Sequence, residues 1–154
     1  MFKPVKTPCI GVCSTGIGDS VCRGCKRFAH EVIDWNAYNH EQRAAIDVRL
    51  QTLLRQVVEA KIRVVNEPLL RQQIEHQRIR YNPDHNSYCW VFDLLKAGAS
   101  QIDDLGRFGC ELNAEWRGRS LRELKSAIDA DFFTLSCAHY DRYFAPRISP
   151  INPD

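Results

Sequence analysis

Hydrophobic residues recur at spacings of three and four over the stretch from Glu41 to Val65, with Arg, Gln and Glu between them. This period predicts an amphipathic helix of about six to seven turns. Asn39, followed by Gln42 three positions later, has the form of an N-terminal cap and predicts where the helix begins. The apolar face consists of Ile46, Leu50, Leu53, Leu54, Val57, Val58, Ile62 and Val65.

Shorter helices are predicted further along the chain. Pro68 suits the first turn of a second helix that carries Leu69, Leu70 and Ile74, with Ile79 as a further candidate. After the turn-forming residues 81–86, Ser87 is predicted to cap a short apolar helix that ends at Gly98.

The last third of the chain begins with residues 99–119, which contain three glycines and are predicted to be irregular with one short helical turn. Ser120 and Glu123 form a capping box that predicts a helix through Ile128, and a further short helix is predicted over 132–143. No run alternates cleanly enough to predict a sheet. The ordered chain is predicted to end at the prolines Pro146, Pro150 and Pro153.

The N-terminal segment has a different character. Residues 1–27 are rich in Cys, Gly, Ser, Thr and Pro and show no helical or strand period. Such a segment buries too little apolar surface to order itself, so a bound metal is expected to help. The predicted fold class is therefore mostly α, with a small Cys₄ metal-binding module over 1–38 packed on a helical region over 39–154.

The expected compartment and the number of cysteines indicate whether the cysteines form disulfides. No apolar run approaches the ~18 residues of a membrane span, and residues 1–6 lack the apolar region of a secretory signal. The sequence therefore predicts a cytoplasmic protein with no membrane partner, in which thiols stay reduced. The cysteine count of seven is odd, which does not suit a fully paired disulfide framework.

Four of the cysteines are the candidate metal ligands. Their spacing is Cys9-x3-Cys13-x8-Cys22-x2-Cys25. A Cys₄ set suits tetrahedral Zn²⁺ or an iron–sulfur cluster equally well, and both assignments stay open. Chance clustering within 17 positions is the simpler alternative and is disfavoured. Basic residues beside the last pair would offset the thiolate charge, and they are Arg23, Lys26 and Arg27. The other cysteines are expected to be buried and structural, and they are Cys89, Cys110 and Cys137.

A family resemblance rests on an ordered series of motifs. These are Pro8-Cys9-Ile10-Gly11-Val12-Cys13, Gly18-Asp19, Cys22-Arg23-Gly24-Cys25-Lys26-Arg27, Glu31-Val32, Trp35, Glu41 and Arg43. Over residues 8–50 the chain resembles the bacterial family named domain of unknown function 1289, whose members are labelled predicted iron–sulfur proteins. The resemblance implies a Cys₄ metal site and no established reaction. Phe28 and Tyr38 depart from the family pattern, and the first removes a helix cap.

Aromatic residues crowd the second half of the chain and are expected to form its core. A base-stacking surface is the alternative, and it would need basic residues on the same face. The aromatic set is Tyr88, Trp90, Phe92, Phe108, Trp116, Phe132, Phe133, Tyr140, Tyr143 and Phe144, and the candidate basic residues are Arg117, Arg119, Arg122 and Arg142. Trp35 and Tyr38 are instead expected to seat the metal module on the long helix.

Other signals are weaker. The net charge of +2 does not indicate a nucleic-acid partner, although residues 1–66 hold 10 Lys and Arg against 6 Asp and Glu. His30 with Glu31 and Asp34 could support the metal ligands, but an exposed helix histidine is the favoured interpretation. The remaining histidines are expected to pack or face solvent, and they are His40, His76, His85 and His139. The sequence has no phosphate loop or nucleophile elbow, and a non-enzymatic role is favoured.

Three functions remain open at this point. The first is a non-catalytic metal-binding accessory protein, in which the Cys₄ site organises the N-terminal module for contact with another protein. The second is an iron–sulfur redox or cluster-carrier protein. The third is an RNA-contacting module that uses the basic N-terminal half.

Overall fold

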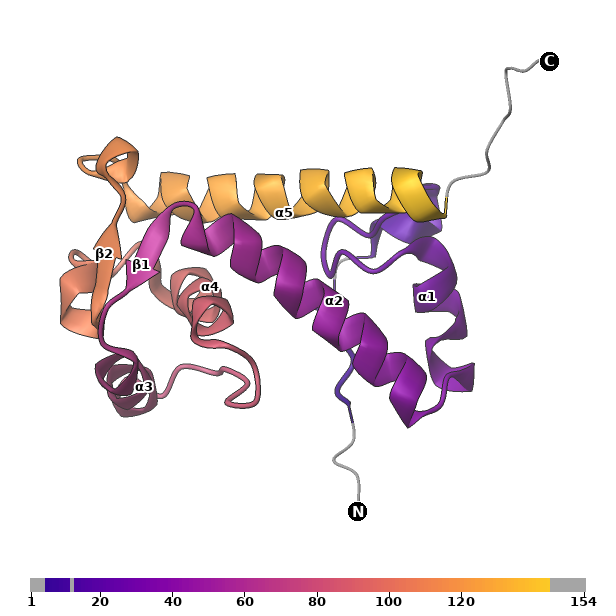
Figure 1. Ribbon diagram of the computed structural model, residues 1–154, viewed down its shortest axis with the longest axis horizontal. Coiled ribbons are helices and arrows are strands. Elements are labelled where there is room, and N and C mark those ends of the chain that lie inside the picture. Colours follow the sequence, from indigo (N-terminus) through magenta and orange to yellow (C-terminus); the bar gives the residue numbers. More distant parts are fainter. Residues whose placement is uncertain (1–4, 12, 145–154) are drawn as a thin grey trace.

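The computed structural model describes residues 5–11 and 13–144. Two long helices form its frame: α2 (His40–Glu59) and α5 (Leu121–Tyr143). Helix α5 runs along one side of the molecule, and α2 crosses beneath it at an angle (Figure 1). Helix α4 (Ser87–Gly98) packs against both of them. The predicted mostly α fold is confirmed.

The remaining elements are short. Helix α1 (Ala29–Asp34) precedes α2, and α3 (Glu67–His76) packs against α4. Strands β1 (Ile62–Val64) and β2 (Cys110–Leu112) form a two-stranded antiparallel sheet. Single turns of 3₁₀ helix cover Ser14–Ile17, Trp35–Ala37, Leu105–Phe108 and Ala114–Trp116.

The hydrophobic core lies where α2, α4 and α5 meet and extends beneath α3 and the sheet. Helix α4 is apolar on almost every side because it lies between α2, α3 and α5. Its fully buried residues are Val91, Leu94 and Leu95. Among the described residues, no helix is long and apolar enough to cross a membrane.

Side-chain caps fix where several helices begin. Asn39 and Gln42 each accept the other's backbone N–H at 2.9 Å, so the predicted capping box of α2 is confirmed. Ser120 caps α5 through the backbone N–H of Glu123. The predicted cap of α4 is wrong by one residue, because Asn86 is the cap and accepts a hydrogen bond from the backbone of the third helical residue.

The long amphipathic helix is shorter than predicted. It ends at Glu59, and Ile62–Val64 form a strand in register with Cys110–Leu112. The predicted absence of a sheet is therefore wrong, because a three-residue strand carries too little alternation to be recognised. Gly109 stabilises the pairing with φ +72°, and a Cβ there would lie 2.5 Å from the backbone oxygen of Asn66.

The C-terminal helix is longer than predicted. The two short helices expected through Ile128 and over 132–143 form the single helix α5. Two acidic residues in the expected gap pair with lysines from elsewhere in the chain: Asp129 with Lys26 and Asp131 with Lys61. The three prolines predicted to end the ordered chain lie outside the described residues.

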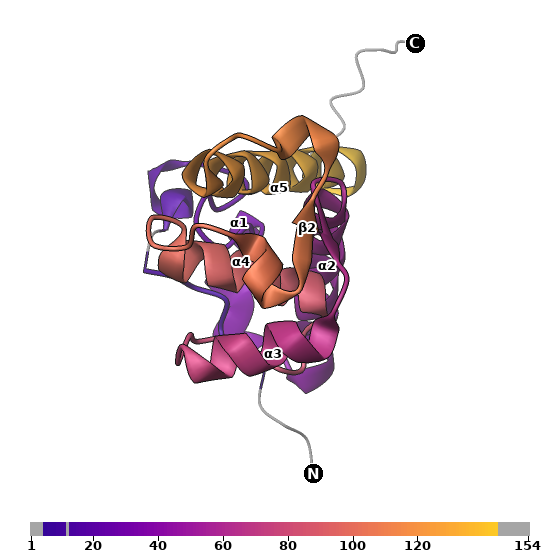
Figure 2. The ribbon, with the colours of Figure 1, turned by 90° about the vertical axis from the view of Figure 1, so that its left-hand side faces the viewer.

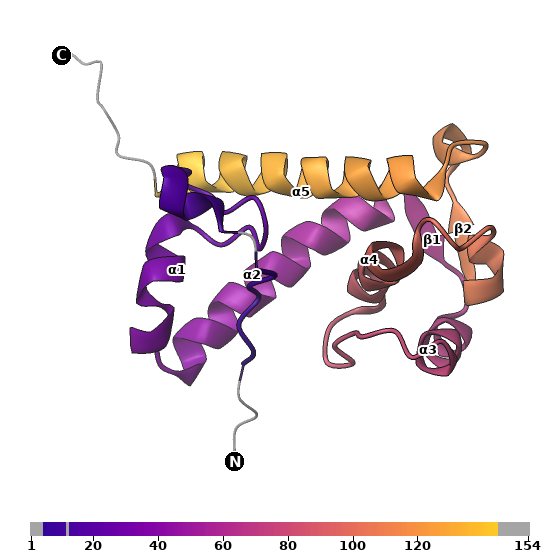
Figure 3. The same cartoon turned by 180° about the vertical axis from the view of Figure 1, so that it is seen from behind.

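The described residues that precede α1, called the cysteine segment below, lie beside the C-terminal half of α5. This is the end of the molecule farthest from the sheet (Figures 1 and 3). Val21 and Phe28 form an isolated antiparallel bridge that closes the turn holding Cys22 and Cys25. The segment is therefore held by its own turn and by contacts with α5, and it positions the predicted ligands at one end of the helical frame.

Candidate metal centre

The residues from Cys22 to Arg27 form a tight turn. The backbone N–H of Cys22 donates to Arg27 O at 2.8 Å, and the N–H of Lys26 donates to Cys22 O at 2.8 Å. Lys26 adopts φ +67°, a left-handed backbone conformation that residues other than glycine rarely adopt. The sulfurs of the Cys-x2-Cys pair therefore lie on one turn, as the spacing predicts.

The Cys22 sulfur has a polar environment although only 1% of the residue is exposed. Burial raises the pKa of the Cys22 thiol, but backbone hydrogen bonds from Cys25, Ser14 and Gly24, with a further bond to the Cys25 side chain, outweigh it. The pKa is lowered to about 7 as a result. A ring of amide N–H donors stabilises a thiolate, which is the form that binds metal.

The Cys25 sulfur faces a guanidinium group. Arg27 is buried, and its Nε lies 3.2 Å from Cys25 Sγ. Burial raises the pKa of Cys25, and the hydrogen bonds and charge of Arg27 oppose this rise. The Arg27 guanidinium also lies 4.9 Å from the Trp35 ring centre, so it links the cysteine turn to the aromatic residue before α2.

The other two predicted ligands do not join this pair. Cys9 and Cys13 are exposed. The Cys9 sulfur accepts a hydrogen bond from Gly11 N at 3.4 Å, and the Cys13 sulfur lies 3.1 Å from Thr15 Oγ1. Among residues 5–11 and 13–144, no group of three or more His, Cys, Asp or Glu side chains is arranged to hold a metal ion. The four-cysteine set stays a prediction.

The chemistry of the donor set nevertheless fits a metal. Cys22 and Cys25 have thiolate-stabilising partners, and Ser14 Oγ accepts from Arg23 N at 2.8 Å, which fixes the residue after Cys13 to the turn. The loop that carries the first pair has open space around Gly11, Gly16 and Gly18.

Lys26 attaches the turn to α5 in a way that the sequence did not reveal. Its side chain is almost fully buried, and Nζ donates to Arg23 O at 2.6 Å and to Gly24 O at 3.2 Å. The same Nζ pairs with Asp129 on α5. The partner is 103 positions away, so no local pattern could have identified this contact.

Glu31 performs a similar role between α1 and α2. Its Oε1 accepts a hydrogen bond from Phe28 N at 2.9 Å, which is the glutamate half of a capping box, and Phe28 has no side-chain acceptor for the other half. Both Glu31 oxygens also accept from the guanidinium of Arg49. Helix α1 therefore begins directly after Phe28 although the expected side-chain cap is missing.

Aromatic side chains cover the same region. Trp35 is buried, and the guanidinium groups of Arg27 and Arg43 both lie over its ring. Phe28 is fully buried and contacts Tyr140 and Phe144 of the α5 end, with ring centres 5.1 Å apart in each case.

The expected second-half core is therefore only partly correct. The aromatic residues buried in it are Trp90, Phe92, Phe108, Trp116 and Phe132. Tyr140, Tyr143 and Phe144 instead lie near the cysteine segment, and the last two are exposed. The candidate base-stacking residues are spread over different elements: Arg119 lies over Trp116, whereas Arg142 lies over Tyr143 at the other end of α5.

The other cysteines have apolar surroundings. Cys89 and Cys110 are buried as predicted, and burial raises the pKa of each thiol to about 12. Cys137 is only partly buried, so the expectation of full burial is wrong for it.

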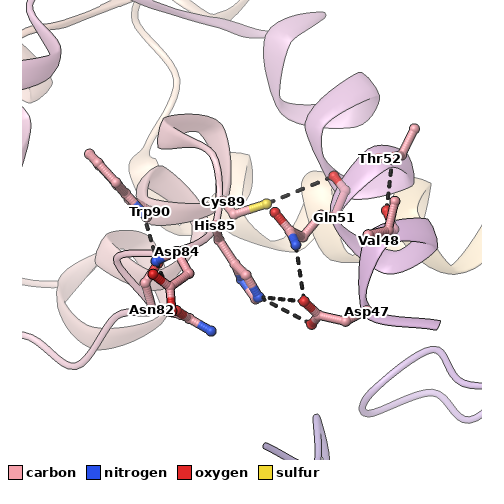
Figure 4. A network of polar contacts seen from close by, with 9 residues as sticks. All are labelled: Asp47, Val48, Gln51, Thr52, Asn82, Asp84, His85, Cys89 and Trp90. Carbon is pink, nitrogen blue, oxygen red and sulfur yellow. Dashed lines mark hydrogen bonds and ion pairs between the residues drawn. The ribbon is translucent and has the colours of Figure 1, made fainter. Parts of the chain in front are cut away.

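The histidines lie apart. His30 is exposed on α1, as predicted, and it contacts the rings of Phe28 and Phe144. His139 packs beside Tyr143, and burial lowers its pKa. His85 Nε2 lies 3.1 and 3.2 Å from the two carboxylate oxygens of Asp47 (Figure 4).

The fold and this site define a mostly helical protein with a cysteine-rich N-terminal segment. Residues 7–54 match the model of a family described as Protein of unknown function (DUF1289), in agreement with the resemblance of the motifs. The matched segment includes the four predicted ligands, α1 and most of α2. No curated protein and no solved structure matches the chain.

Proposed function

We propose that this chain is a non-catalytic metal-binding accessory protein. Cys9, Cys13, Cys22 and Cys25 bind one Zn²⁺ ion or one iron–sulfur cluster. The metal orders the N-terminal segment for contact with another protein. The observation that carries the proposal is the Cys22–Cys25 turn, where buried sulfurs meet backbone N–H donors and a guanidinium instead of apolar side chains.

The role of the metal follows from the ligand set. Four cysteines fill a tetrahedral coordination shell and leave no open position for substrate, as in structural zinc sites. The binding free energy of such a metal is largely folding free energy. The segment around Cys9 and Cys13 is exposed and has few apolar contacts of its own, so it has the most to gain from a metal.

The proposed partner is a protein because the same end of the molecule exposes large apolar side chains. Ile17 is 86% exposed and Ile33 is 77% exposed, and Ile10 is exposed as well. Exposed apolar groups beside polar ones are typical of protein interfaces. RNA contact is disfavoured because Lys26, Arg27 and Arg49 are used inside the protein and do not face solvent.

The alternative is an iron–sulfur redox or cluster-carrier protein. The Arg27 Nε···Cys25 Sγ hydrogen bond of 3.2 Å favours it, because hydrogen bonds to sulfur and nearby positive charge tune the reduction potential of a cluster. A visible absorption band that dithionite bleaches would support this alternative. Colourless, zinc-loaded protein from iron-replete cells would exclude it.

A cysteine substitution tests the main proposal. Cys22→Ser should lose the metal and expose residues 7–28 to protease while α2, α4 and α5 stay folded. Cys137→Ser is the matched control, because that thiol is partly buried on α5 and belongs to no predicted ligand set. If Cys22→Ser keeps its metal and its protease resistance, the proposal is wrong.

A further inference from the structure

Lys26 is buried although it is charged, and it lies directly after the last predicted ligand. Only 1% of the residue is exposed. A buried ammonium is stable only when acceptors replace the water that it loses. Its Nζ donates to Arg23 O at 2.6 Å and to Gly24 O at 3.2 Å, and it pairs with the Asp129 carboxylate. These acceptors match the three N–H groups of an ammonium, so the position of Nζ is fixed.

The two carbonyl groups belong to peptide groups that donate to the Cys22 sulfur on their other side. Arg23 O shares a planar peptide group with the N–H of Gly24, and Gly24 O shares one with the N–H of Cys25. Both peptides are trans, so the C=O and the N–H of each point in opposite directions. The N–H groups of Gly24 and Cys25 are two of the three backbone donors to the Cys22 sulfur. Lys26 therefore holds the oxygen side of the two peptide groups whose nitrogen side donates to the predicted ligand.

The charge of Lys26 strengthens this arrangement. The ammonium attracts both carbonyl oxygens, which turns the positive ends of the two peptide dipoles toward the Cys22 sulfur. Hydrogen bonds in such a series polarise one another. Thiolate ligands bring negative charge to a metal, and this charge is therefore stabilised by two oriented N–H groups and, behind them, by the ammonium.

The third acceptor links the turn to the helical body. Asp129 lies on α5, 103 positions from Lys26 in the sequence. Lys26 Nζ also lies 5.5 Å from the ring centre of Phe132, three positions further along the same helix. In the end-on view of Figure 2, α5 lies at the top and the indigo cysteine segment lies next to it. A continuous series of contacts therefore joins α5 to the Cys22 sulfur through Lys26 and two peptide groups.

We propose that Lys26 is a positioning residue of the metal centre. It orients the N–H groups of Gly24 and Cys25 toward the Cys22 sulfur, and it couples metal binding to its contact with Asp129. The coupling rests on the proposed metal function, whereas the orientation of the peptide groups does not need a bound ion. Because coupling between two sites is reciprocal, a change at Asp129 should alter the metal affinity although Asp129 is not a predicted ligand.

Cadmium tests the orientation directly, because ¹¹³Cd²⁺ is a soft ion that thiolates bind and that NMR detects. An N–H group that donates to a metal-bound sulfur shows a scalar coupling between its proton and the metal. In the cadmium-loaded wild type, the amide protons of Gly24 and Cys25 should couple to ¹¹³Cd. Both couplings should weaken together in Lys26→Met. Lys61→Met is the matched control, because it breaks a comparable pair with Asp131 and should leave both couplings unchanged.

Cadmium affinity, measured by competition with a chelator, tests the coupling to α5. Lys26→Met should weaken binding about tenfold, the usual size of the effect for a residue that supports metal ligands. Asp129→Asn should weaken it about fivefold, because Lys26 loses its contact with α5. Asp131→Asn is the matched control two positions along the same helix, where the carboxylate pairs with Lys61 instead. It should change the affinity less than about twofold.

A second control separates orientation from general charge. Arg23→Gln also removes a positive charge beside the turn, but the Arg23 side chain is exposed and pairs with Asp19. It should change the cadmium affinity less than about twofold. Equal losses of affinity in Lys26→Met and Arg23→Gln, or in Asp129→Asn and its control, would show a general charge effect and overturn the proposal.

The cadmium couplings give the other decisive result. Couplings of wild-type size in Lys26→Met would show that the turn orients its peptide groups without the lysine, and the proposal would be wrong. A wild type that binds no metal would contradict the proposed function instead. The metal-free protein then decides the orientation: the amide protons of Gly24 and Cys25 should shift together in Lys26→Met and not in Lys61→Met. Unchanged amide shifts in Lys26→Met would overturn it.

Discussion

The cysteine segment and the helical body are ordered by different forces. The body buries apolar side chains: Leu94 and Leu95 of α4 and Ile128 of α5 are fully buried. The cysteine segment and α1 bury charged residues beside Val21 and Phe28, with Lys26 bound to Asp129 and Glu31 bound to Arg49. Burying an apolar side chain stabilises the fold against any well-packed neighbour, whereas burying a charged side chain does so only when its specific partner is present. The segment is therefore positioned specifically but depends on a few contacts.

The same contrast holds for sulfur. The pKa of Cys22 is lowered to about 7 by backbone hydrogen bonds, and the pKa values of Cys89 and Cys110 are raised to about 12 by burial. Cys22, whose thiolate is stabilised in the turn, therefore differs from the inert cysteines of the core.

The largest expected effect comes from breaking the Glu31–Arg49 pair. Glu31→Ala leaves the Arg49 guanidinium without its carboxylate and removes the acceptor for Phe28 N–H. Removing one partner of a buried pair costs about 3–5 kcal/mol, so the urea midpoint should fall sharply. Glu59→Ala is the control, because its pair with Arg55 is exposed and is worth about 0.5 kcal/mol. Equal effects of the two changes would contradict the distinction between buried and exposed pairs.

The next largest effect is expected from Lys26, one of the two lysines that pair with acidic residues of α5. Lys26→Met removes hydrogen bonds to Arg23 O and Gly24 O and the pair with Asp129, which should cost about 2 kcal/mol. Amide hydrogen exchange should quicken in residues 20–28 and not in α4. Lys61→Met, which breaks the pair with Asp131, should leave the exchange of the cysteine turn unchanged. Faster exchange throughout the protein after Lys26→Met would show that the segment and the body unfold together.

A smaller effect appears in the pH dependence of the metal-free protein. The folded-state pKa of Cys22 is below that of the unfolded chain, so its thiolate stabilises the folded state fully above about pH 9. That stability is lost as the pH falls through about 7. The melting temperature of the wild type minus that of Cys22→Ser should therefore rise between pH 7 and 9. A difference that falls over this range would show that the backbone donors do not stabilise the thiolate.

The smallest effect concerns the cap of α4 in the body. Asn86→Ala should destabilise the protein by about 1 kcal/mol, because the backbone N–H of Cys89 loses its acceptor. Ser87→Ala should have almost no effect on thermal unfolding, since the side-chain cap of α4 is Asn86. The opposite ranking would restore Ser87 as the cap.

Local patterns predicted the elements that depend on local contacts. The capping box at Asn39, the helix after Pro68 and the start of α5 at Ser120 were correct, because caps and apolar periods act over a few residues. The sheet was missed because β1 and β2 are 46 positions or more apart and each has only three residues. The continuity of α5 was missed because its acidic residues, Asp129 and Asp131, find their lysines only in the folded chain.

The candidate metal centre divides in the same way. The spacing of Cys22 and Cys25 predicted their shared turn, since two intervening residues leave few alternatives. The roles of Lys26, Glu31 and Arg49 follow from contacts between distant elements, so no sequence spacing predicts them. Cys9 and Cys13 lie on a loop with open space around its glycines, so the local sequence does not determine where their sulfur atoms lie.

The sulfur coordination of the metal is the most direct test of the central claim. X-ray absorption of anaerobically purified protein should show zinc or iron bound by four sulfur ligands at about 2.3 Å. Cys9→Ser and Cys22→Ser should each reduce the metal content, and Cys137→Ser should not. Metal-free protein with full helicity and unchanged stability, or a metal bound by fewer sulfurs and indifferent to Cys9→Ser, would contradict the account.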